Sequence, residues 1–216
     1  MNMKKRMLSI VLSGAMAVST AVSAGSFSAF AVAQCVAYSG SNVNAQDYVQ
    51  WSDTVKSYLT VCDNGNYMRV QSGAIEGKLL VEYYSPDFEP LSTKLIDNEL
   101  PIFGAFYDSG NNYYVLSGQE NPKQNDSLEV FRITKYDKNW NKIKSCGLYG
   151  ANTTVPFDAG SARMTHSGDH LLVRTCHEMY KSSDGNNHQS NVTIEVDMPS
   201  MTITDSYTGV MNVDYG

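Results

Sequence analysis

The sequence has few charged residues and lacks the short motifs that mark common catalytic sites. Charged residues occupy 18% of the 216 positions, a fraction that argues against a disordered acidic or basic chain. No G-x-S-x-G elbow, H-E-x-x-H helix or phosphate-binding glycine loop occurs in it, so we assign no catalytic residue. The hydrophobic fraction of 42% is enough for the core of a soluble globular protein.

Basic residues and long apolar runs are also scarce, which excludes two classes of partner. The formal net charge is −6, so binding to nucleic acid through phosphate neutralisation is not expected. After residue 31, no run approaches 18 apolar residues. A membrane-spanning segment is therefore not expected in the mature chain.

The first 31 residues are predicted to be a secretory signal peptide. Residues 4–6 are Lys-Lys-Arg, residues 7–22 form an apolar run, and residues 29–31 read Ala-Phe-Ala, a small-x-small cleavage site. A cut after Ala24 also fits, whereas a membrane anchor is the weaker interpretation because the run is short and diluted by polar residues. Cleavage removes three of 16 basic and none of 22 acidic residues, leaving −9. We expect the mature protein to be extracellular or in the cell envelope.

Four cysteines occur, and their spacing leaves their state open. They are Cys35, Cys62, Cys146 and Cys176. In an exported protein an even number permits two disulfides, in any of three connectivities, and each cysteine fits a buried free thiol equally well. No paired C-x-x-C is present, so a zinc knuckle is not expected.

From residue 58 onward, the sequence repeats one pattern of short strands. Each unit begins with a hairpin that turns at a glycine, Gly65, Gly110 or Gly168, and continues with a second hairpin that turns at Asp, Asn or Pro. The units are spaced like propeller blades, which run to about 40–50 residues. Residues 32–57 are predicted to be a lead-in segment before residues 58–216. The approximate bounds of the units are 58–100, 101–159 and 160–207, with the start of another at 208–216.

The repeated pattern, for example ITKYDKNWNKIKS after NNYYVLSG, resembles bacterial secreted β-propeller repeat proteins over about residues 58–207. The resemblance implies an all-β, propeller-like fold of about three four-stranded antiparallel blades. A single β-sandwich or barrel is the alternative. Since propellers close at about four to eight blades, we expect an incomplete propeller, either a fragment or a chain whose open edge is covered by a partner or by self-association.

The four histidines fall close together in the sequence, at His166, His170, His177 and His188. Such a cluster is a candidate transition-metal site. However, strand alternation places His170 and Cys176 on one face and His177 on the other. Fewer than three ligands then converge, so we predict no metal site and no cofactor.

The third unit also contains the candidate ligand-binding residues. They are Arg163, His166, Arg174, His177 and Glu178. An arginine within an apolar strand is costly unless it is paired or faces a cavity, so Arg174 indicates either an anion or carbohydrate site or a structural salt bridge to an acid such as Glu178.

These features favour a secreted propeller-like binding or scaffold module for an extracellular ligand, either a glycan or a protein. Two other interpretations remain open. In the first, the chain is part of a propeller enzyme that acts on extracellular glycans. In the second, it is a structural envelope protein.

Overall fold

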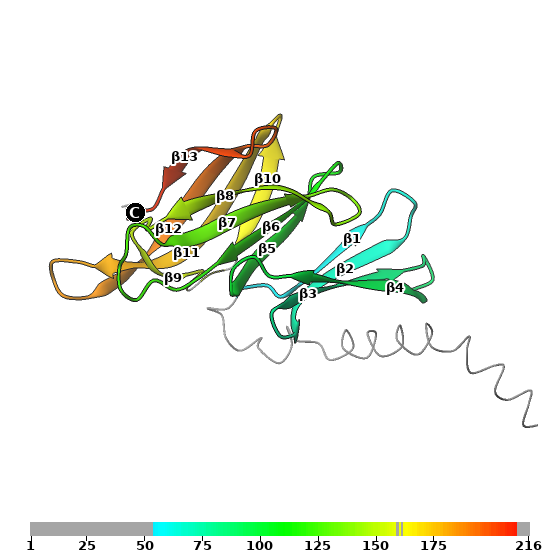
Figure 1. Cartoon of the computed structure of the whole chain (residues 1–216), viewed down its shortest axis with the longest axis horizontal. Coiled ribbons are helices and arrows are strands. Elements are labelled where there is room, and N and C mark those ends of the chain that lie inside the picture. Colours follow the sequence, from blue (N-terminus) through cyan, green and yellow to red (C-terminus); the bar gives the residue numbers. More distant parts are fainter. Residues whose placement is uncertain (1–53, 159, 161, 211–216) are drawn as a thin grey trace, which may run out of the picture.

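The computed structural model describes residues 54–158, 160 and 162–210, and these contain thirteen β-strands and no helix (Figure 1). The predicted signal peptide and most of the predicted lead-in segment lie outside this range. No described segment has the helical length and hydropathy needed to cross a membrane.

Twelve of the strands form three antiparallel sheets in which neighbours in sequence are neighbours in space. The first sheet contains β1 (Ser57–Val61), β2 (Tyr67–Ile75), β3 (Lys78–Tyr84) and β4 (Pro90–Asp97). The second contains β5 (Ile102–Asp108), β6 (Tyr113–Gly118), β7 (Glu129–Tyr136) and β8 (Lys142–Tyr149). The third contains β10 (Arg163–Ser167), β11 (His170–Lys181), β12 (Asn187–Asp197) and β13 (Thr202–Tyr207). The predicted all-β fold of three four-stranded units is confirmed.

The predicted glycine turns join the first two strands of each sheet. Gly65, Gly110 and Gly168 have φ values of 82°, 89° and 56°. Glycine adopts this left-handed region without the steric cost that a β-carbon imposes, so each turn is encoded locally.

One strand was not predicted. β9 (Thr153–Pro156) pairs with the far end of β11, where His177 lies opposite Pro156. β11 has 12 residues and therefore extends past the 5-residue β10, which leaves its end available to another strand.

The three sheets stack in series, with an apolar core in each of the two interfaces. The first inter-sheet core lies between the first and second sheets and includes Met68, Val81, Phe106, Tyr113 and Trp140. The second inter-sheet core lies between the second and third sheets and includes Tyr114, Phe131, Phe157, Ile194 and Met201. Three stacked sheets rule out the two-sheet sandwich, and β6, covered on both sides, is buried at all six positions.

The first strands of neighbouring sheets lie next to one another, and so do the last strands of the second and third sheets. β5 contacts β10 and β8 contacts β13, while the Tyr58 ring of β1 lies edge-on to Phe106 of β5 with centroids 6.0 Å apart. Each sheet therefore runs outward from a shared edge, as blades do around a propeller axis. The described residues form three propeller-like blades, in keeping with an incomplete propeller.

Within the described residues, Cys62, Cys146 and Cys176 are free thiols, and Cys35 lies outside them. Burial raises the pKa of all three thiols, that of Cys146 to about 11. These cysteines therefore have the character of small, partly buried apolar side chains.

Candidate functional site

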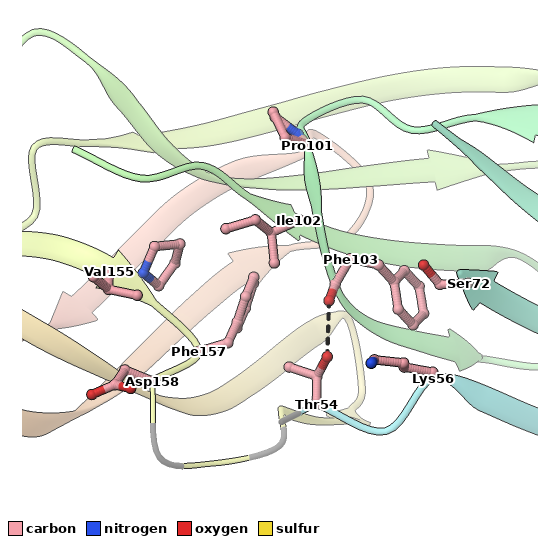
Figure 2. Close-up of a pocket in the computed structure, with 10 residues that line it drawn as sticks. Thr54, Lys56, Ser72, Pro101, Ile102, Phe103, Val155, Phe157 and Asp158 are labelled. Atoms are coloured by element: carbon pink, nitrogen blue, oxygen red, sulfur yellow. Dashed lines mark hydrogen bonds between the residues drawn. The ribbon is translucent and has the colours of Figure 1, made fainter. Parts of the chain in front are cut away.

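The candidate site is a pocket of about 350 Å³ at the shared edge of the sheets, which we call the axial pocket (Figure 2). Its lining comes from the chain leading into β1, the start of β5, and β9 with the link that follows it. The lining residues are Thr54, Lys56, Ser72, Pro101, Ile102, Phe103, Val155, Pro156, Phe157 and Asp158. All three blades thus contribute to, or adjoin, one concave site.

Phe157 forms the apolar wall of the axial pocket, and two glycines make room for its ring. A β-carbon added at Gly104 would lie 2.4 Å from Cζ of Phe157, and one at Gly118 would lie 2.8 Å from Cε2. The ring also meets Phe131 edge-on, with centroids 5.4 Å apart, and Phe157 is 3% exposed. Its φ of 62° is unfavourable for a bulky residue, so the backbone there is held by packing of the ring.

Two hydrogen bonds to backbone carbonyls hold the opposite side of the pocket. The Thr54 hydroxyl donates to the Phe103 carbonyl at 3.1 Å, the contact drawn in Figure 2. The Ser72 amide donates to the Lys56 carbonyl at 2.8 Å. The chain entering β1 is thereby tied to both β5 and β2.

Two side chains of opposite charge flank the apolar wall. Lys56 and Asp158 stand on opposite sides of the pocket (Figure 2), and both are half-buried. Oδ2 of Asp158 accepts a hydrogen bond from Nε2 of Gln189 at 2.6 Å, which orients the carboxylate. A carboxylate accepts and an ammonium donates, so the pocket offers both kinds of partner to a polar ligand.

Of the five sequence-predicted residues, the structure brings Arg163 and Arg174 together. They are directly opposite one another on β10 and β11, so both side chains leave the same face. Nη1 of Arg174 donates to Oγ1 of Thr193 at 2.9 Å. The two arginines border a shallow hollow of about 270 Å³ on the outer face of the third sheet.

His166 lies in a different contact, between two blades. Its Nδ1 is 2.7 Å from the hydroxyl of Tyr107, and the two rings meet edge-on. This contact joins β10 to β5, so His166 has a structural role at the shared edge.

His177 is fully buried and turned to the opposite side of β11 from Arg174. Its Nδ1 lies 2.6 Å from Oγ1 of Thr153 on the adjacent β9. Burial lowers the pKa of His177 to about 4, an effect only partly opposed by the backbone of Thr208. The imidazole is thus neutral at physiological pH and faces the core.

Glu178 belongs to a fourth location. Its carboxylate accepts a hydrogen bond from Oγ1 of Thr154 at 2.6 Å and lines a hollow of about 280 Å³ with Glu120 and Lys181. The five predicted residues therefore do not form one site. The predicted alternation along β11 is confirmed, since His177 is buried while His170 is exposed. Among the described residues, no three potential metal-ligating side chains converge.

The residues of the axial pocket were missed because they lie in segments without strand periodicity. Thr54 and Lys56 fall in the predicted lead-in, and Phe157 and Asp158 in a link between units. Gly104 and Gly118 inside strands were the available signal, because glycine within a strand often marks a close approach of another group.

Comparison with known proteins gives no family. The chain matches no family model and no curated protein. Among solved structures, it is similar to a mutant of Synechocystis apocarotenoid oxygenase, at 12% identity and a TM-score of 0.47, over 71% of this chain and 38% of that one. It is also similar to Drosophila Semaphorin 1a, extracellular domains 1-2, at 8% identity and a TM-score of 0.39, over 66% of this chain and 26% of that one. A GH43 β-1,3-galactosidase matches at 12% identity and a TM-score of 0.38, over 69% and 44%.

Proposed function

We propose that the protein is a secreted, propeller-like binding module that holds one sugar unit of an extracellular glycan in the axial pocket. The observation that carries this proposal is the pocket of about 350 Å³ built where the blades share an edge. Ligand sites are concave and mostly apolar, with a few placed polar groups, and they begin at about 300 Å³. The partly exposed Ile102 and Val155 side chains, backed by the buried Phe157 ring, offer an apolar wall for a sugar ring.

The charges of the pocket suit hydroxyl groups. A sugar hydroxyl both donates and accepts, so it can donate to the carboxylate of Asp158 while another accepts from the ammonium of Lys56. The predicted signal peptide at residues 1–31 supports an extracellular ligand. That segment lies outside the described residues.

A binding role is favoured over glycoside hydrolysis. Most glycosidases use a pair of carboxylic acids that flank the scissile bond. Among the described residues that line the axial pocket, Asp158 is the one acid, and Glu178 lines a separate hollow. Arg174, His177 and Glu178, the residues of the enzyme interpretation, point to three different environments.

The test is a glycan array of extracellular polysaccharide fragments, followed by calorimetric titration of the strongest binder. We expect Lys56→Ala and Asp158→Asn each to weaken binding by about tenfold or more, the loss of about 1.4 kcal/mol. Lys78 and Asp97 form a matched Lys–Asp pair on the surface, so Lys78→Ala and Asp97→Asn should leave affinity within about twofold.

Equal losses in the pocket and control variants would contradict the proposed site. Absence of binding to every glycan would refute the glycan as ligand and favour a protein ligand or a structural envelope role. Release of a reducing sugar from the bound glycan would show that the chain is part of an enzyme.

A further inference from the structure

The second sheet docks onto the first through a group of aromatic rings at its last hairpin. Trp140, in the turn between β7 and β8, is 4% exposed and has a φ of 64°. Its ring lies 4.8 Å from that of Tyr113, which is opposite Tyr136 across the sheet. Nε1 of Trp140 donates to the hydroxyl of Tyr83 on the first sheet at 3.1 Å. The hairpin thus inserts a left-handed aromatic residue into the face of the preceding sheet.

The first sheet has the same arrangement. Phe88, in the turn between β3 and β4, has a φ of 63°, and its ring stacks on Tyr67 with centroids 4.6 Å apart and planes 4° apart. Tyr67 is opposite Tyr84, as Tyr113 is opposite Tyr136 in the second sheet. However, Phe88 is 61% exposed.

The third sheet, like the second, buries the left-handed residue of its last hairpin. Met201, in the turn between β12 and β13, has a φ of 50° and is 3% exposed in the second inter-sheet core. At this hairpin position, two sheets of three therefore bury a side chain against the sheet that precedes them. Only the first sheet has no preceding sheet among the described residues, and there the side chain is exposed.

Lysines complete both interfaces. Nζ of Lys144 donates to the Ser200 carbonyl at 2.6 Å, and Nζ of Lys135 donates to the Met198 carbonyl at 2.9 Å. Both acceptors belong to the turn between β12 and β13. In the other interface, the Lys94 ammonium donates to the Asn139 carbonyl in the turn between β7 and β8. Each docked hairpin thus receives lysine from the preceding sheet.

We infer that the outer face of the first sheet is a docking surface for one further four-stranded sheet, carried by a partner protein and presenting lysine on its outer strand. The exposed apolar side chains of this face are Leu59, Val61, Phe88, Leu91 and Leu95. Of these, Leu59 and Phe88 line one hollow of about 370 Å³, and exposed large apolar side chains that cluster in this way mark an interaction surface. The hairpin that carries Phe88 also contains the exposed acids Asp87 and Glu89, which complement the lysines of such a partner.

The charges on the third sheet argue against a second copy of this chain as the partner. In the second sheet, Lys135 of β7 pairs with Lys144 of β8 directly before a β-bulge. In the third sheet, the pair directly before the β-bulge is acidic, with Glu195 of β12 opposite Asp205 of β13. Docked head to tail on the first sheet of another copy, these acids would face Asp87 and Glu89. Like charges across an interface oppose association.

The experiment introduces a lysine pair on the third sheet, at positions 195 and 205, and tests whether that sheet then binds the first sheet of another copy of the chain. We expect the double variant Glu195→Lys, Asp205→Lys to self-associate in sedimentation velocity, with an association constant about tenfold or more above that of the wild-type protein. Adding Phe88→Asp to the double variant should abolish the gain. A charge-matched control, Asp63→Lys with Glu76→Lys, should sediment as the wild-type protein does, because both acids lie in other turns.

Two results would overturn the inference. The first is a double variant that does not self-associate, or that self-associates even with Phe88→Asp. In either case the lysine pair would not dock on the outer face of the first sheet. The second is a wild-type protein that already dimerises and is made monomeric by Phe88→Asp. That result would make a second copy the natural partner despite the charges.

Discussion

Replacement of Gly104 by alanine tests how the wall of the axial pocket is held. The φ of Gly104 lies outside the left-handed region, so the cost of the change is steric. The new β-carbon would lie 2.4 and 2.5 Å from two ring carbons of Phe157, and the ring must move. Overpacking of this kind costs about 2 kcal/mol of unfolding free energy. Phe157→Ala removes a ring that is 3% exposed and should cost about 4 kcal/mol.

The double variant separates the ring contact from all other effects. With Phe157 truncated, the nearest remaining atom to the β-carbon at position 104 is Cγ of Leu116 at 3.1 Å, so the cost of Gly104→Ala should fall to about 0.5 kcal/mol. The coupling energy is then about 1.5 kcal/mol, measured by urea unfolding of the four proteins with equal slopes. Gly65→Ala is the control, because Gly65 has a φ of 82° and nothing within 4 Å of an added β-carbon. Its cost of about 1 kcal/mol should be the same with and without Phe157.

Additive costs for Gly104→Ala and Phe157→Ala would refute this reasoning. They would mean that the ring does not occupy the space above Gly104, and the apolar wall of the pocket would be misplaced with it.

Three further predictions concern the core. Burial lowers the pKa of His177 to about 4, so as the pH falls the unfolded chain binds a proton before the folded chain does. The free energy of unfolding is therefore highest above about pH 6.5 and should fall by about 3 kcal/mol as the pH is lowered to 4. Urea titrations of His177→Asn should not show this loss. Because burial raises the pKa of Cys146 to about 11, its alkylation by iodoacetamide at pH 8 should be roughly 100-fold slower in the folded than in the unfolded protein, and peptide mass spectrometry would reveal a faster reaction. Trp140→Ala should lower the free energy of unfolding, measured in guanidinium, by about 4 kcal/mol because it removes a buried ring. Tyr83→Phe should lower it by about 1 kcal/mol, because it removes only the hydroxyl that accepts from Nε1 of Trp140. Equal losses for the two variants would contradict this assignment.

The strands and their first turns were predictable because their determinants are local. The hairpin around Gly168 brings Arg163 and Arg174 together simply by counting outward from the turn, and the structure has them opposite. In contrast, β9 pairs with β11 across more than twenty residues, and its four residues have no partner signal in sequence. Pairing between strands that are distant in sequence depends on how the sheets stack. The alternation of apolar and polar residues along a strand does not encode that stacking.

The axial pocket was out of reach for the same reason. Thr54, Phe103 and Asp158 come from segments about fifty residues apart, and each is unremarkable in its own segment. They converge because the first strands of the blades share an edge. The five candidate residues show the converse, since neighbours in sequence along β11 point alternately to the core and to the outside and so lie in different environments.

Phe88 and Trp140 mark the boundary between the two kinds of information. Their hairpins set nearly the same left-handed φ, 63° and 64°, and bring each ring against the tyrosine that begins the second strand of its sheet, with centroids 4.6 and 4.8 Å apart. Local sequence is sufficient for that geometry, because turn and bulge involve only adjacent strands. Whether the ring is buried, as at Trp140, or exposed, as at Phe88, depends on whether another sheet lies against it. That depends on the tertiary arrangement, because burial is a property of the surrounding surfaces and not of the hairpin itself.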